Sequence, residues 1–161
     1  MPRPPLIAVC GASTPSPEEA TLARSVGRRL AERGALVLCG GLGGVMEACA
    51  EGVREAGGTS IGLLPGWDPD EAAEAVGVAL PTGLGEVRNA LLARACVAMV
   101  AVGGGYGTLS EIAFARRLGR PVATLSSWQL HRDGAQIDDP DLFAAGSPAA
   151  AVDWALDHVP D

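Results

Sequence analysis

The chain has 161 residues, 48% of them apolar, which is enough to bury the core of a single domain spanning residues 1–161. Its formal net charge of −7 argues against a protein that coats nucleic acid, because such proteins carry basic patches. All 12 basic residues are arginine, which excludes a Walker A loop and a pyridoxal phosphate Schiff base, since both need a lysine.

The first half of the chain alternates short apolar runs with helical patterns. We predict strands at residues 6–10, 35–39, 59–64 and 76–80. A capping box at Ser16, followed by Pro17, begins a helix that ends near Gly34, and a second helix is expected over residues 45–56. The acidic stretch 67–74 is a loop or a short helix.

The second half continues the alternation. A helix is expected over residues 85–95, a buried central strand over 97–102, a helix running to about residue 118, and a sixth strand over 121–125. No pattern assigns the polar stretch 126–141, whereas 142–145 fit a last strand and Ser147 caps a final helix to His158. This alternation predicts a Rossmann-like, doubly wound α/β fold with a mostly parallel sheet and helices on both faces.

Two glycine-rich loops follow predicted strands, at the sheet edge where such folds bind ligands. GGLGGVME at 40–47 and GGYGTLSE at 104–111 share two glycines, a spacer, a glycine, three residues and a glutamate. Each loop would present free N–H groups and a helix N-terminus to an anion, although tight turning without a ligand explains the same pattern. Neither loop contains the dinucleotide fingerprint G-x-G-x-x-G, which disfavours NAD and FAD. The expected phosphate-binding residues, which include the turn after the first strand, are Gly11, Ser13, Gly40, Gly41, Gly43, Gly44, Gly103, Gly104, Gly105, Tyr106, Gly107 and Thr108.

The cysteines, histidines and tryptophans bear on the cellular compartment and on the cofactors that we expect. The four cysteines form no C-x-x-C pair, and the apolar run near the N-terminus is too short for a signal peptide, so we expect a cytoplasmic protein with no membrane span. His131 and His158 lie too far apart in sequence to suggest a metal pair, and we expect neither a metal nor an organic cofactor. Trp128 and Trp154 are interpreted as packing or interface aromatics.

The spacing of an arginine and the second loop resembles the LONELY GUY (LOG) superfamily, long mislabelled as lysine decarboxylases. In that family an arginine is followed, fifteen residues on, by P-G-G-x-G-T-x-x-E, and here Arg88 precedes GGGYGTLSE at residues 103–111. The stretch 40–66 is also similar to the family's first glycine loop and following strand, and the resemblance runs from about residue 7 to 125. Gly103 replaces the family's proline and Asn89 its lysine, which looks more like a side branch that includes molybdenum-cofactor carrier proteins.

The resemblance implies a catalytic pair, Arg88 and Glu111, and a phosphate site at the GGGYGT loop. Active family members hydrolyse the N-glycosidic bond of cytokinin riboside 5′-monophosphates to free base and ribose 5-phosphate. The alternative implied by the side branch is a non-catalytic carrier for molybdenum cofactor or another phosphorylated pterin or nucleotide. A DNA-processing protein of related fold is disfavoured by the acidic charge balance.

The resemblance also implies a homo-oligomer, at least a dimer, because family members pair through helices beside the site. An apolar helix face along Val87, Leu91 and Ala95 agrees with this expectation. The partners expected are thus a small phosphorylated nucleotide-like ligand and further copies of the chain.

Overall fold

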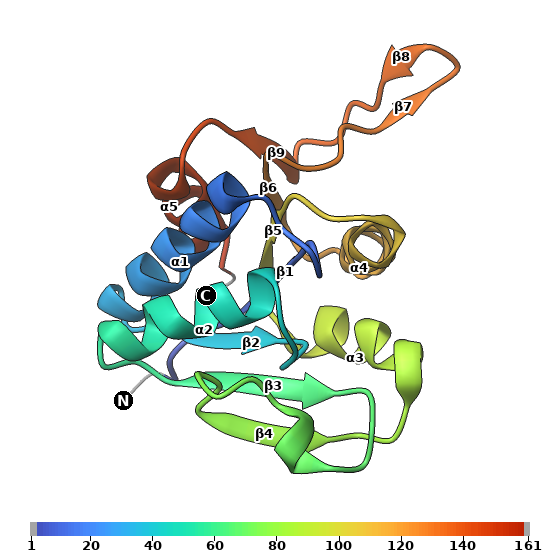
Figure 1. Ribbon diagram of the computed structural model, residues 1–161. Helices are drawn as coiled ribbons and strands as arrows, with labels where there is room; N and C mark the ends of the chain where they lie inside the picture. Colours follow the sequence, from blue (N-terminus) through green and yellow to red (C-terminus); the bar gives the residue numbers. More distant parts are fainter. Residues whose placement is uncertain (1–2, 160–161) are drawn as a thin grey trace.

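A seven-stranded parallel sheet lies at the centre of the computed structural model, which describes residues 3–159 (Figure 1). The strand order is β4-β3-β2-β1-β5-β6-β9, so the direction of strand addition reverses between β1 and β5. The strands are β1 (Leu6–Gly11), β2 (Leu36–Cys39), β3 (Ser60–Leu64), β4 (Val78–Pro81), β5 (Ala98–Val102), β6 (Val122–Leu125) and β9 (Leu142–Ala145).

Helices cover both faces of this sheet, which confirms the predicted fold class. One face carries α1 (Pro17–Glu32), α2 (Val45–Glu55) and α5 (Pro148–Asp157), and the other carries α3 (Arg88–Ala95) and α4 (Tyr106–Arg117) (Figure 1). Within residues 3–159, no helix has both the length and the apolar character that crossing a bilayer requires.

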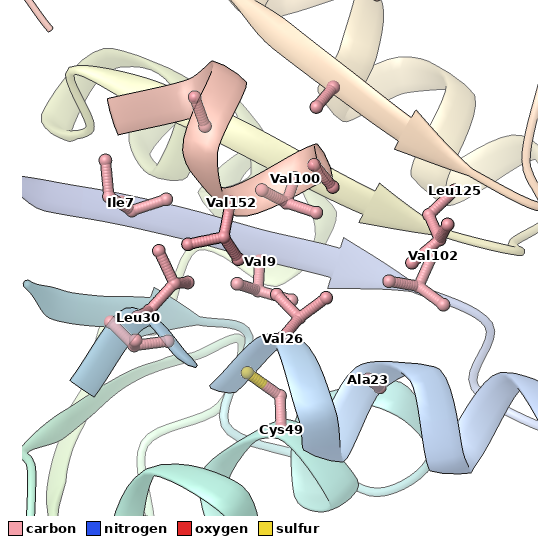
Figure 2. Packing of buried hydrophobic residues seen from close by; sticks show 14 of the residues in the cluster. Ile7, Val9, Ala23, Val26, Leu30, Cys49, Val100, Val102, Leu125 and Val152 are labelled. Carbon is pink, nitrogen blue, oxygen red and sulfur yellow. The ribbon is translucent and has the colours of Figure 1, made fainter. Parts of the chain in front are cut away.

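The alternation of side chains along β1 separates two cores. Ile7 and Val9 point towards α1, α2 and α5, where they pack with Val26 and Val152 (Figure 2). Ala8 and Cys10 point the other way and pack with residues of α3 and α4. Because successive strand residues face opposite sides, the Cys10 thiol at the end of β1 faces the α3–α4 side of the sheet.

The predicted capping box at the start of α1 is confirmed. The Glu19 backbone N–H donates to the Ser16 hydroxyl at 3.1 Å, and the Ser16 N–H donates to the Glu19 carboxylate at 2.8 Å. Pro17 occupies the first helical position, where its missing N–H costs nothing.

Three segments add detail that the sequence pattern lacked. The expected helix over 85–95 divides into a 3-10 turn, η2 (Gly85–Val87), and α3, and Gly85 begins it with a φ of +57°. A second 3-10 turn, η1 (Pro69–Glu71), lies in the acidic stretch. The unassigned stretch contains an antiparallel hairpin of β7 (His131–Arg132) and β8 (Ala135–Gln136) that extends away from the sheet (Figure 1).

Candidate functional site

A cleft of about 290 Å³ opens at the carboxyl edge of the sheet, where the strand order reverses. Open parallel sheets bind ligands at this position because two neighbouring loops turn to opposite faces there. The lining comes from the end of β1 and from the segments after β1, β2, β4 and β5. The residues are Cys10, Gly11, Ser13, Leu42, Met46, Glu86, Arg88, Asn89, Gly107, Thr108 and Glu111.

Arg88, the first residue of α3, supplies the positive charge of the cleft. Its side chain is buried, with 8% of the residue exposed, and burial lowers the pKa of the guanidinium while the nearby Glu111 opposes that shift. Nε and Nη1 have no hydrogen-bond partner among the residues that the structure describes. Unpaired buried donors on a cation are costly, by about 1–3 kcal/mol or more, so an anionic ligand would remove a real penalty.

Glu111 lies in the second turn of α4 and faces the same cleft. The residue is 7% exposed, and burial raises the pKa of its carboxyl group to about 7, against the opposing effects of Arg88 and of a hydrogen bond with Cys10. The pKa of the Cys10 thiol is raised by its burial and by Glu111. A carboxyl group that titrates near neutral pH suits proton transfer in either direction.

The second glycine-rich loop leaves the N-terminus of α4 open. The first intrahelical bond runs from Leu109 N–H to Gly105, so the N–H groups of Tyr106, Gly107 and Thr108 precede the helical ladder. They donate to no other group within residues 3–159. Space is open around Gly105 and Gly107, and this loop therefore offers several donors and a helix dipole to an anion.

The first glycine-rich loop is partly closed by contacts within the protein. The first N–H of α2, at Val45, donates to the Ala12 carbonyl at 2.9 Å, which occupies the helix N-terminus. A Cβ at Gly40 would overlap the Arg88 guanidinium, and one at Gly41 would lie 2.7 Å from Leu64. The glycines Gly40 and Gly41 of this loop therefore pack against other parts of the protein, and Gly40 contacts the Arg88 side chain.

The structure thus separates the predicted phosphate-binding residues into groups. Gly11, Ser13, Gly107 and Thr108 lie in the cleft with Arg88 and Glu111. The structure does not bring into the cleft Gly40, Gly41, Gly43, Gly44, Gly103, Gly104, Gly105 or Tyr106; of these, Gly103 and Gly104 line a neighbouring depression. The first loop contributes Leu42 and Met46 instead.

Sequence reasoning did not assign a site role to Asn89 or Glu86, which flank Arg88 and line the cleft. The Asn89 side-chain amide donates to the Ser110 hydroxyl at 3.3 Å, and that hydroxyl donates to the Gly107 carbonyl at 2.6 Å. Asn89 therefore links α3 to the open loop. Both Asn89 and Glu86 could have been predicted as site residues from the sequence, because they lie close to Arg88 on the segment that follows β4.

The donor set of the cleft suits an anion better than a metal ion. Arg88 and the free N–H groups of α4 are donors, and Glu111 and Glu86 are the carboxyl groups. In the described part of the chain, no three His, Cys, Asp or Glu side chains gather closely enough to hold a metal ion.

Comparison with known sequences links the chain to one family. The sequence profile described as the SLOG cluster4 family matches residues 4–152. An uncharacterised protein of Archaeoglobus fulgidus is 40% identical over 119 residues, which are 74% of this chain and 78% of that protein. The probable cytokinin riboside 5′-monophosphate phosphoribohydrolase LOGL9 of Oryza sativa subsp. japonica is 42% identical over 79 residues, covering 48% of this chain and 35% of the plant protein. The chain thus spans about a third of the length of this plant relative.

Solved structures with the same fold match almost the whole chain. The molybdenum cofactor binding protein of Rippkaea orientalis superposes with a TM-score of 0.87 at 30% identity and covers 98% of this chain and 99% of its own. The Moco carrier protein of Chlamydomonas reinhardtii gives a TM-score of 0.85 at 33% identity, with 97% and 98% covered. DNA processing protein A of Streptococcus pneumoniae, 16% identical with a TM-score of 0.71 over 98% of this chain and 62% of its own, shares the fold alone.

Proposed function

The chain belongs to the SLOG cluster4 family, and from that premise we propose that it binds a cytokinin-like purine riboside 5′-monophosphate and hydrolyses the N-glycosidic bond. The products are the free base and ribose 5-phosphate. One observation carries the proposal: a buried arginine with unpaired donors and a buried carboxyl group of pKa about 7 face one cleft beside an open helix N-terminus. The probable phosphoribohydrolase activity of the plant relative supports the same reaction.

Glu111 is assigned the chemical step. When the bond between C1′ and the base nitrogen breaks, its electron pair leaves with the base and positive charge develops on the ribose. The Glu111 carboxylate stabilises that charge and accepts a proton from the water whose oxygen bonds to C1′. The leaving nitrogen takes up one proton from solvent, and Glu111 returns to solvent the proton that it accepted from water, so one water molecule is consumed in all. Because the pKa of Glu111 is about 7, the side chain can both accept and release a proton near neutral pH, as these reaction steps require.

Arg88 and the α4 N-terminus are assigned the binding step. The free N–H groups of Tyr106, Gly107 and Thr108 hold the 5′-phosphate, as helix N-termini commonly do. The planar Arg88 guanidinium contacts phosphate or ribose oxygens and fixes the sugar relative to Glu111. No metal or organic cofactor enters this scheme.

The second candidate is a carrier that binds a molybdenum cofactor, or another phosphorylated pterin or nucleotide, without cleaving it. Two observations favour it: the carrier structures cover almost the full chain, and the loop differs from the LOG pattern at Gly103. Gly103 has a φ of +57°, whereas proline requires about −65°, so the LOG proline does not fit this backbone.

Release of free base separates the two candidates. We expect the wild-type protein to release base from at least one of a panel of purine riboside 5′-monophosphates and not from the dephosphorylated nucleosides. Glu111→Gln keeps the shape of the side chain and should lower turnover by roughly a hundredfold while ligand affinity barely changes. Arg88→Ala should weaken binding and turnover together, because its contacts are made before the transition state.

The chain supplies a matched control for Glu111. Glu47 occupies the corresponding place after the first glycine-rich loop and does not line the cleft, so Glu47→Gln should keep wild-type turnover. A wild-type protein that binds these nucleotides but releases no base above the Glu111→Gln level would contradict hydrolysis. Native mass spectrometry of the freshly purified protein, with a retained pterin or nucleotide, would then identify the carrier's ligand.

A second copy of the chain is the proposed protein partner. An apolar groove of about 370 Å³ runs between η2–α3 and α4, and Val87, Leu84 and Phe114 are 67%, 47% and 41% exposed in it. Exposed apolar patches of this kind mark association surfaces. Light scattering at micromolar concentration should give at least a dimer, and Leu91→Glu should give a monomer; a monomeric wild type would contradict the proposal.

The cytoplasm is the proposed compartment. The four cysteines are buried and free, which suits a reducing environment. Fractionation of cells that produce the protein tests this, and recovery outside the cytoplasmic fraction would contradict it.

A further inference from the structure

A second depression, of about 430 Å³, adjoins the second glycine-rich loop and shares no lining residue with the cleft that holds Arg88 and Glu111. Its lining comes from the loop itself, from the start of α1 and from the segment after β6: Glu19, Gly103, Gly104, Ser126, Ser127, Trp128 and Gln129. The reaction proposed above uses none of these side chains. The depression is therefore available to a part of the ligand that lies beyond the phosphate.

The indole of Trp128 is fixed against the loop. Its Nε1–H donates to the Gly105 carbonyl at 3.1 Å, and the neighbouring Ser127 hydroxyl donates to the Gly103 carbonyl. Ser126 holds a φ of +50°, a conformation that residues other than glycine rarely adopt and that marks functional segments. Two hydrogen bonds and a strained turn thus hold an aromatic side chain beside the helix N-terminus.

A second aromatic ring extends this surface. Tyr106, the first residue of α4, is 83% exposed, and its ring centre lies 5.8 Å from that of Trp128 at an interplanar angle of 36°. Trp128 is half-buried and packs against the core on the α3–α4 side of the sheet, so only part of its ring faces the depression. Aromatic rings beside phosphate donors are a recurrent arrangement for stacking nucleobases. Glu19, at the edge of the depression, offers a carboxylate to an N–H donor on a stacked ring.

Cleft and depression meet at the loop. Thr108 lines the cleft, and its side chain packs directly on Gly104, which lines the depression. A phosphate held by the α4 N–H groups therefore has the cleft on one side and the aromatic pair on the other. A nucleoside 5′-monophosphate bound as proposed above, with its sugar beside Arg88 and Glu111, would leave the aromatic pair uncovered.

We propose that Trp128 and Tyr106 form a second ring-binding subsite, and that the ligand carries a planar ring on each side of its phosphate group. The ligand class is then a nucleotide joined through a phosphodiester or phosphoanhydride to a second ring with an N–H donor. This inference rests on the proposed binding of a nucleotide phosphate at α4. It requires no cleavage, so it stands equally if the protein is a carrier.

Calorimetric titration with AMP, ADP and diadenosine diphosphate tests the subsite. ADP controls for the second phosphate, and diadenosine diphosphate adds only the second nucleoside. In the wild-type protein we expect diadenosine diphosphate to bind about tenfold more tightly than ADP, the gain that stacking of one base on aromatic side chains provides. Equal affinities for the two ligands would overturn the inference, whereas failure of AMP and of every other purine riboside 5′-monophosphate of the panel to bind would overturn the proposed function instead.

Variants of Trp128 separate ring stacking from a structural role. Trp128→Leu should abolish the tenfold gain and weaken AMP far less. Trp128→Phe keeps an aromatic face but loses the hydrogen bond to Gly105, and it should retain most of the gain. If Trp128→Phe is as damaging as Trp128→Leu, the indole only braces the loop and the inference is wrong. Trp67→Leu, at a tryptophan 80% exposed that lines neither hollow, is the control and should leave all three affinities unchanged.

Discussion

The two glycine-rich loops follow one sequence pattern and have different structural roles. The loop before α2 is partly closed, because its first helical N–H, at Val45, donates to the Ala12 carbonyl and neighbouring side chains cover Gly40 and Gly41. The loop before α4 is open, with free N–H groups and empty space at Gly105 and Gly107. The same local motif thus serves once as a support for Arg88 and once as a candidate anion site.

A glycine-rich pattern therefore predicts the backbone conformation of a loop but not whether the loop binds a ligand. Both loops need glycine to turn tightly from strand to helix. What distinguishes them is the segment that packs on each: the turn after β1 covers the first loop, and no segment of residues 3–159 covers the N–H groups of the second. The corresponding glutamates differ in the same way, since Glu111 lines the cleft and Glu47 does not.

The largest expected effect contrasts one glycine from each loop. Gly41 has a φ of +77° and its Cβ would contact Leu64, so Gly41→Ala should lower the free energy of unfolding by roughly 2–5 kcal/mol. Gly105 has a φ of −102° and open space, so Gly105→Ala should change it by less than about 0.5 kcal/mol. Urea denaturation measures both, and equal losses would break the distinction between closed and open loops.

The next effect concerns the two corresponding glutamates and pH. Burial raises the pKa of Glu111 from 4.5 to about 7, so between these values the folded state keeps a proton that the unfolded state releases. The contribution of Glu111 to the free energy of unfolding is therefore full below pH 4.5 and is lost as the pH rises through 7. The loss amounts to at most about 3 kcal/mol. Glu111→Gln should lack this fall in the free energy of unfolding from pH 5 to 8, and Glu47→Gln should retain it. Parallel pH profiles for the wild type and Glu111→Gln would refute the assignment.

A smaller effect tests whether the closed loop positions Arg88. A Cβ at Gly40 would overlap the guanidinium and lie 2.5 Å from the Met46 sulfur, so Gly40→Ala should displace Arg88 and weaken nucleotide binding by about tenfold. Gly146→Ala, which adds a methyl group in open space far along the chain, is the control. Unchanged affinity in Gly40→Ala, measured by calorimetry, would show that the loop does not support Arg88.

The smallest effect separates stability from binding in the open loop. Gly107 lies in the first turn of α4 with no atom near its Cβ position, so Gly107→Ala should raise the free energy of unfolding by roughly 0.5 kcal/mol. The same methyl group enters the cleft and should weaken nucleotide binding. Thermal unfolding and calorimetry measure the two changes, and a gain in stability with unchanged affinity would indicate that the ligand does not approach this loop.

The architecture could be predicted from the order of the residues alone. Buried parallel strands are continuous apolar runs, and the helices between them begin with local signals such as the capping box at Ser16. The alternation of strands and helices could therefore be predicted without knowledge of tertiary contacts. The secondary structure of residues 126–141, which contain few apolar side chains, could not be predicted in this way. This segment forms a hairpin through a tight turn at Asp133 and Gly134, whose φ values are +53° and +80°. It lacks the apolar residues that mark a buried strand in the sequence.

Contacts between distant segments determine which of the predicted site residues lie in the cleft. Arg88 and Glu111 are far apart in the chain, and their shared burial depends on the packing of α3 against α4 across the end of β1. Burial sets the pKa of Glu111 and leaves two Arg88 donors unpaired among the described residues, and neither property is visible in a residue's identity. Which of two like-patterned loops stays open was likewise settled by non-local contacts, because a helix N-terminus binds a ligand only where no carbonyl of the protein already occupies it.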